Sequence, residues 1–87
     1  MCTYNTEQVQ LSGSGKGATG WFSVTGATVY YDHPVHAMAE HTLNIDFRNP
    51  ALGPSARVAV ELTAESARAL AAAIEAALAS VPAALIS

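Results

Sequence analysis

The feature that most constrains the fold is a pair of short segments in which apolar and polar residues alternate. In the first, His41 to Phe47, the apolar residues are Leu43, Ile45 and Phe47. The second, Arg57 to Leu62, alternates in the same way and is followed directly by an alanine-rich segment. A period of two places every apolar side chain of a strand on one face. Both segments are therefore predicted to be half-buried strands.

Two more strands are predicted upstream of this pair. Residues Thr3 to Ser12 show the same alternation, and Trp21 to Tyr31 is rich in the β-branched and aromatic residues typical of strands. Gly26, in the middle of the second segment, is a candidate for a β-bulge. The glycine-rich residues 13–20 between the two strands are predicted to form a flexible loop.

The alanine-rich segment is predicted to be the only helix. Thr63 is a suitable N-cap, and Glu65 is favourable at the positive end of the helix dipole. Arg68 and Glu75 mark the face opposite an apolar stripe. That stripe comprises Ala67, Leu70, Ala71, Ile74, Ala77 and Leu78. Four strands with short connections and a final helix favour an α+β fold, a four-stranded antiparallel β-meander with one C-terminal α-helix packed on one face.

The chain is predicted to hold one small domain, with residues 1–80 forming the α+β unit and residues 81–87 an apolar C-terminal tail. Although 51% of the residues are hydrophobic, many of these are alanine, so the core is expected to be thin. A domain of this size buries only about 60% of its unfolded surface. Self-association would relieve that shortage, so we expect a homo-oligomer that uses the tail and the outer helix face.

The charge pattern argues against several classes of partner. Four basic residues are scattered along a chain of net charge −3, so no basic stripe is available to neutralise a nucleic-acid backbone. No segment approaches the roughly 20 apolar residues of a membrane span, and residues 1–10 lack the pattern of a signal peptide. A single cysteine cannot form an intrachain disulfide. We therefore expect a cytoplasmic protein that binds neither nucleic acid nor membrane.

The three histidines lie close together in a segment that contains a proline. His33, His36 and His41 fall in or beside a loop that Pro34 stiffens. Antiparallel pairing of the first two strands brings Cys2 to the same end of the predicted sheet. Imidazole nitrogen and thiolate sulfur are ligands that zinc prefers. The sequence thus predicts a divalent transition-metal site, with zinc expected first and these three histidines and Cys2 as its ligands.

The number of ligands would decide what such a metal does. Three protein ligands and an open position allow metal-assisted hydrolysis or proton transfer through a metal-bound water. With Cys2 as a fourth ligand, the site would be closed and structural. Asp32 or Glu40 is placed to orient an imidazole, and Glu40 is a candidate catalytic residue. Whether the protein is an enzyme is left open by the sequence.

Two metal-free alternatives remain open. A thiolate is stabilised beside an imidazolium, so Cys2 with His33 or His41 can act as a nucleophile and its base. The other alternative is an oligomeric binding module whose uncovered sheet face holds a hydrophobic ligand or partner, and a small-molecule ligand is compatible with it. Tyr30 and Tyr31 alternate, so one of the two points away from the helix and can line a pocket there.

The remaining prominent residues receive structural interpretations. Trp21 and Phe22 are predicted to pack in the core, with one ring on the uncovered sheet face as the alternative. Asp46, Arg48 and Glu61 are interpreted as solvated or cross-strand charges, each contributing at most about 1 kcal/mol.

Several segments of the chain resemble those of a family of short, uncharacterised actinobacterial proteins. The segments that carry the resemblance are Met-Cys-Thr-Tyr at 1–4, Ser-Gly-Ser-Gly-Lys-Gly at 12–17, Gly-Trp-Phe at 20–22, Tyr-Asp-His-Pro at 31–34 and Glu-His-Thr-Leu-Asn-Ile-Asp-Phe at 40–47. The similarity extends over the whole chain. It implies no substrate, cofactor or mechanism.

Overall fold

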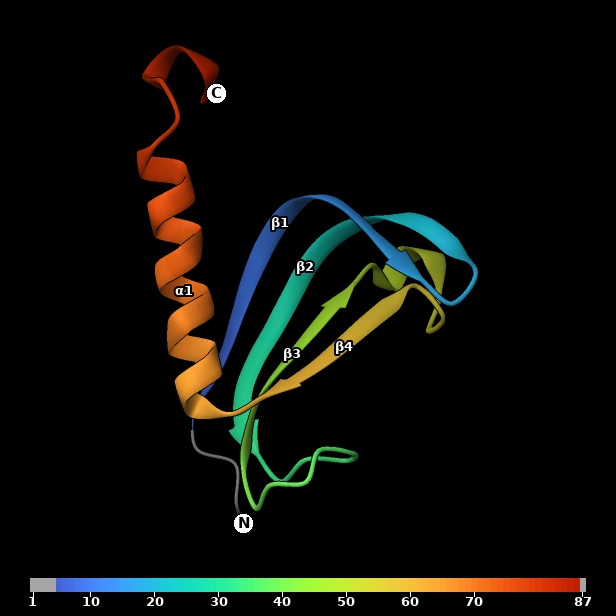
Figure 1. The fold of residues 1–87 in the computed structure, drawn as a ribbon. Helices are drawn as coiled ribbons and strands as arrows, with labels where there is room; N and C mark the ends of the chain where they lie inside the picture. Colours follow the sequence, from blue (N-terminus) through green and yellow to red (C-terminus); the bar gives the residue numbers. More distant parts are fainter. Residues whose placement is uncertain (1–4, 87) are drawn as a thin grey trace.

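A computed structural model describes residues 5–86, which form a four-stranded antiparallel sheet with one long helix beside it (Figure 1). The strands are neighbours in chain order. They are β1 (Thr6–Gly17), β2 (Gly20–Asp32), β3 (Thr42–Arg48) and β4 (Arg57–Leu62), and the helix α1 (Ala64–Ala79) follows. Short 3-10 turns lie at Pro50–Leu52 and Ala83–Leu85. The predicted fold class is confirmed.

The first hairpin is longer than the sequence predicts. The pairing of β1 and β2 runs to Gly17 opposite Gly20, so residues 13–17 are strand and the predicted flexible loop is wrong. The glycines serve close packing instead. A Cβ atom added to Gly15 would lie 3.1 Å from Cγ2 of Val24, and one added to Gly17 would lie 3.1 Å from the ring of Phe22. The bare backbone therefore lets these two side chains lie across β1.

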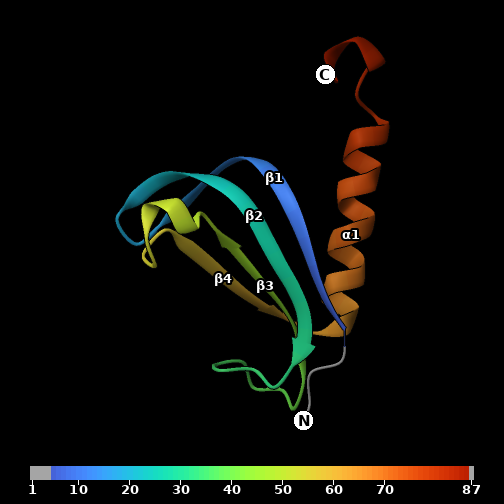
Figure 2. The same ribbon diagram turned by 180° about the vertical axis from the view of Figure 1, so that it is seen from behind.

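A β-bulge in β1 accompanies the curvature of this hairpin. The register passes from Gln10 opposite Gly26 to Gly13 opposite Val24, so β1 carries one extra residue. A bulge increases the local twist and bends the strand. Figures 1 and 2 show the far end of the hairpin curving across the sheet. The predicted position near Gly26 is right, but the extra residue lies in β1.

The two faces of the sheet differ in character. Residues opposite each other on antiparallel strands point to the same side. Tyr30, Asn44 and Glu61 are such partners and lie on a polar face. The neighbouring positions on the same strands, including Leu43 and Leu62, form an apolar face, on which α1 lies.

Helix α1 begins as predicted. The Thr63 hydroxyl accepts a hydrogen bond from the backbone N–H of Ser66 at 3.1 Å, which caps the first turn. The helix packs near β3 and β4, but none of its residues is buried. No helix within residues 5–86 is long and apolar enough to cross a membrane.

The buried core is very small. Among the described residues, the buried hydrophobic side chains belong to Val24, Ala27 and Ala56. Trp21 is 71% exposed, so of the two rings predicted for the core, this one lies outside it. Because neighbouring side chains on a strand point to opposite faces, the inward position of Phe22 turns Trp21 outward.

Candidate functional site

The loop between β2 and β3 brings two of the predicted ligand histidines together. The last pair of this hairpin is Asp32 opposite Thr42, so His33 and His41 are the first and last residues of the loop between the two strands. Their ring centroids are 4.6 Å apart with an interplanar angle of 27°. The Tyr31 ring also stacks on that of His41, with the centroids 5.9 Å apart. The predicted closeness of these two histidines is confirmed, but their rings stack face to face.

This arrangement overturns the predicted metal site. Stacked rings do not direct their nitrogens at a common point, and Nδ1 of His33 already lies 3.0 Å from the carbonyl oxygen of Glu40. Within residues 5–86, no group of three or more His, Cys, Asp or Glu side chains could hold a metal ion. The prediction of a metal-dependent function through His33, His36 and His41 is therefore wrong, and zinc has no site in the described part of the chain.

The other predicted site residues have different outcomes. Cys2, proposed as a ligand and as a nucleophile, lies outside the described residues. Glu40 is exposed, and its backbone carbonyl, rather than its carboxylate, is the group that contacts His33. Catalytic roles for Cys2 and Glu40 stay predictions.

The carboxylate of Glu61 holds the loop on the polar face of the sheet. It accepts hydrogen bonds from three consecutive backbone N–H groups, those of Val35 at 2.5 Å, His36 at 3.1 Å and Ala37 at 2.8 Å. The hydrogen bonds from Val35 and Ala37 hold the pKa of Glu61 below its usual value of 4.5. The interpretation of Glu61 as a solvated or cross-strand charge is wrong, because it anchors a loop about 25 residues away in the sequence.

A pocket of about 500 Å³ lies between this loop and the polar face. The loop supplies one wall through His33 and the residues bound to Glu61. Strands β2, β3 and β4 supply the floor. The floor residues are Tyr30, Asn44, Asp46, Arg57, Ala59, Val60 and Glu61. Tyr30 thus points away from the helix into a pocket, as the alternation with Tyr31 predicts.

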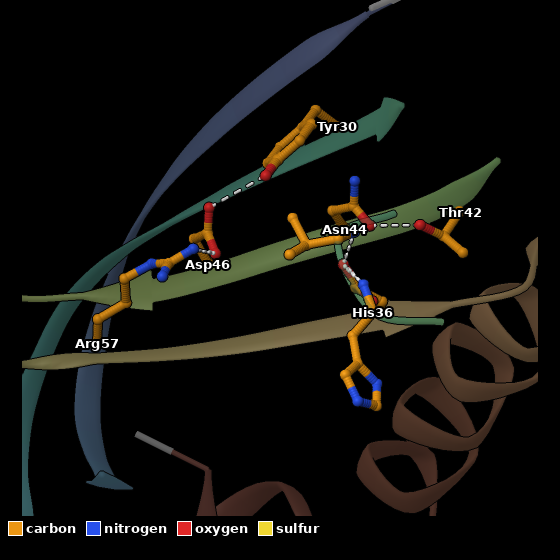
Figure 3. Close-up of polar contacts among 8 residues, drawn as sticks. Tyr30, His36, Thr42, Asn44, Asp46 and Arg57 are labelled. Carbon is orange, nitrogen blue, oxygen red and sulfur yellow. Dashed lines mark hydrogen bonds and ion pairs between the residues drawn. The ribbon is translucent and has the colours of Figure 1, made fainter. Parts of the chain in front are cut away.

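An ion pair and a tyrosine hydroxyl occupy one end of the pocket (Figure 3). Nη2 of Arg57 lies 2.7 Å from Oδ1 of Asp46, and the hydroxyl of Tyr30 donates to Oδ2 of Asp46 at 3.4 Å. Burial, reinforced by the negative charge of Asp46, raises the pKa of Tyr30 above its usual value. Tyr30 therefore stays protonated at neutral pH and acts as a hydrogen-bond donor.

A buried amide lies next to this group on β3. Asn44 is only 5% exposed, and its Oδ1 atom accepts a hydrogen bond from the fully buried hydroxyl of Thr42 at 2.6 Å. This bond orients the amide and leaves Nδ2 without a hydrogen-bond partner within residues 5–86 (Figure 3). No side-chain polar atom in that part of the chain is both fully buried and unpartnered. The Nδ2 atom of Asn44 therefore has solvent contact, and the pocket that Asn44 lines provides it.

The site offers a fixed set of hydrogen-bonding groups. Asn44 presents an N–H donor, Asp46 presents carboxylate lone pairs, and the Arg57 side chain is 54% exposed with further donors available. Val35 and Ala59 add apolar surface. A few oriented polar groups on partly apolar walls are typical of small-molecule binding sites.

Reasoning from residue types alone missed this site, but the signal was present. The alternation of β3 and β4 places Asn44, Asp46 and Glu61 on the face away from the helix. Asn44 and Glu61 face each other on neighbouring strands and Asp46 lies beside them, so the three form a patch rather than isolated surface charges.

Comparisons with known proteins agree with the resemblance seen in the sequence. Neither the curated proteins nor the solved structures yielded a match. One family covers the whole chain, residues 1–87. The resemblance to a family without a known function is thus confirmed, whereas an actinobacterial origin stays a prediction. The chain belongs to DUF6295, a family of unknown function.

Proposed function

We propose that this protein is a binding module for a small polar molecule, which occupies the pocket between the loop at 33–41 and the polar face of the sheet. The observation that carries the proposal is the amide of Asn44, which lines the pocket, is only 5% exposed, and has no hydrogen-bond partner for Nδ2 within residues 5–86. Buried polar groups in proteins are nearly always hydrogen-bonded. A ligand that accepts a hydrogen bond from Nδ2 of Asn44 would provide this donor with a partner.

The size and shape of the pocket support a compact ligand. Its volume of about 500 Å³ lies within the roughly 300–1,000 Å³ of typical small-molecule sites. Asn44 and Asp46 are two residues apart on one strand, so their Cα atoms are about 7 Å apart and their side chains point to the same side. A ligand with an acceptor and a donor on opposite edges of one ring can reach both.

The charges of the pocket favour a neutral ligand. Asp46 is neutralised by Arg57, and the carboxylate of Glu61 is engaged by backbone N–H groups. An anionic ligand would approach two carboxylates, whereas a neutral one can donate to Asp46 and accept from Asn44. The sequence-based alternative of a hydrophobic ligand on the uncovered sheet face fits less well, because this face carries polar groups at its centre.

Protein-observed NMR with a library of neutral single-ring compounds tests the proposal. We expect hits to shift the Asn44 side-chain amide and the backbone amides of Val35 and Ala37 in a saturable way. Asn44→Asp keeps the acceptor for Thr42 but removes the donor, so affinity should fall about 10-fold or more. Gln8→Glu makes the same chemical change at an exposed position of β1 outside the pocket and should leave affinity unchanged.

The proposal fails if no compound produces saturable shifts at these amides. It also fails if the hits bind Asn44→Asp and the wild type equally well, because the amide donor then plays no part in binding.

A further inference from the structure

The helix carries an apolar stripe that the chain itself does not cover. Leu70, Ile74 and Leu78 follow one another at intervals of one turn and are 44%, 51% and 50% exposed. None of the residues of α1 is buried. Beyond the helix, Leu85 and Ile86 are 74% and 52% exposed. Apolar residues in such a row on one face of a helix normally pack against another element.

The apolar face of the sheet is open as well. Figures 1 and 2 show α1 and the strands meeting near the start of the helix and diverging toward its C-terminal end. An apolar groove of about 340 Å³ lies between them. Its main walls are Val29, Leu43, Ile45 and Leu62 from the sheet and Leu70 and Ile74 from the helix.

The amount of exposed surface exceeds what a folded monomer of this mass shows. A chain of 9.0 kDa is expected to expose about 4,850 Å², whereas this one exposes 6493 Å². The radius of gyration is 14.5 Å, against about 12 Å for a compact domain of this length. The excess of about 1,600 Å² leaves room for a standard interface, in which each partner buries roughly 800 Å².

We infer that a second copy of this chain covers this surface. The α1 helices of the two copies lie antiparallel, and each apolar stripe enters the groove of the other copy. A two-fold axis relates the copies, so the same patch serves on both sides. Because this surface lies on the face of the sheet opposite the polar pocket, the inference does not depend on the proposed ligand.

The charges on α1 support this pairing. The sequence places Arg68 and Glu75 opposite the apolar stripe, but Arg68 lines the groove between α1 and the sheet, so this placement is wrong. The two residues are seven apart, which is almost two turns, so both lie along one edge of the stripe. In an antiparallel pair of helices, the same edges of the two helices face each other. Arg68 of one copy then lies opposite Glu75 of the other, and the reverse holds at the other end of the interface. A second copy thus matches the surface in area, in apolar character and in charge.

Light scattering coupled to size-exclusion chromatography of the full chain tests the inference. The wild type should elute with twice the 9.0 kDa mass of one chain at micromolar concentrations. Ile74→Glu places a charge on the apolar stripe within the proposed interface, where Ile74 also lines the groove, and should weaken the dimer by more than about 100-fold. Ala72→Glu, about 200° round the helix from Ile74, is the matched control and should leave the dimer intact.

The design separates loss of the dimer from loss of the fold. Glutamate has a helix propensity at least as good as isoleucine, so Ile74→Glu does not weaken the helix itself. If this variant is nevertheless unfolded, the wild-type midpoint of thermal unfolding must rise with protein concentration, as a dimer requires. A monomeric wild type with a concentration-independent midpoint would overturn the inference. A dimer that Ile74→Glu leaves intact would overturn it too.

Discussion

The hydrogen bond between Thr42 and Asn44 provides a prediction whose size follows from the structure. Thr42→Val keeps the shape and the β-branching of the side chain but removes the hydroxyl that donates to Oδ1 of Asn44 at 2.6 Å. Thr42 is 1% exposed and Asn44 5%, so the acceptor is left without a partner in a buried place. Leaving a buried polar group unpaired costs about 1–3 kcal/mol.

We expect a loss of about 1.5 kcal/mol in the free energy of unfolding, because the amide can rotate and recover part of the bond. For a chain of 87 residues, this corresponds to a fall of about 8 °C in the unfolding midpoint. Circular dichroism during heating and in urea measures both quantities, with all variants compared at the same protein concentration.

Thr28→Val is the matched control for this change. Thr28 lies on the same face of the sheet, in β2, and its hydroxyl makes no hydrogen bond within residues 5–86. The control should stay within about 0.5 kcal/mol of the wild type. If Thr42→Val is as stable as Thr28→Val, the hydroxyl does not hold the amide of Asn44, and the orientation on which the proposed site depends is refuted.

Three further predictions concern the loop, the first hairpin and the exposed tryptophan. The hydrogen bonds that lower the pKa of Glu61 stabilise the docked loop fully above pH 4.5 and are lost as the pH falls through the lowered pKa. In an NMR titration, the backbone amide signals of Val35 and Ala37 should therefore shift together in that range. Signals that stay unchanged down to pH 2 would contradict this. Gly17→Val should lower the free energy of unfolding in urea by about 1–3 kcal/mol, because the new Cβ atom would press on the Phe22 ring. An unchanged urea midpoint would contradict the close packing of Phe22 against residue 17. Trp21→Ser should change stability by less than about 0.5 kcal/mol, since the ring is 71% exposed, and a larger loss would place the ring in an interface.

The strands and the helix were predictable where one local pattern decides the structure. The alternation in residues 57–62 gives the bounds of β4 as observed, and Thr63 caps α1 as its position before the helical stripe predicts. Local patterns failed for the first hairpin. A run of glycines normally indicates a loop, but here Gly15 and Gly17 extend β1 because Val24 and Phe22 need the space beside them. That requirement becomes visible only after the strands are paired.

The candidate site was harder to predict for a related reason. Residue types suggested a metal site, and the hairpin register correctly brought His33 and His41 together, but ligation depends on where the ring nitrogens point. The pocket depends on Glu61 binding the backbone of the loop, a contact between distant parts of the chain that no local pattern indicates. Backbone N–H groups are present at almost every residue, so the sequence does not mark these donors.

A crystal structure of the protein soaked with neutral single-ring compounds tests the central claim most directly. We predict a compound in the pocket beneath the loop at 33–41, with an acceptor atom about 2.7–3.2 Å from Nδ2 of Asn44 and a donor facing Asp46. Compounds that bind only in the apolar groove beside α1, or that leave Nδ2 of Asn44 without a partner, would contradict it.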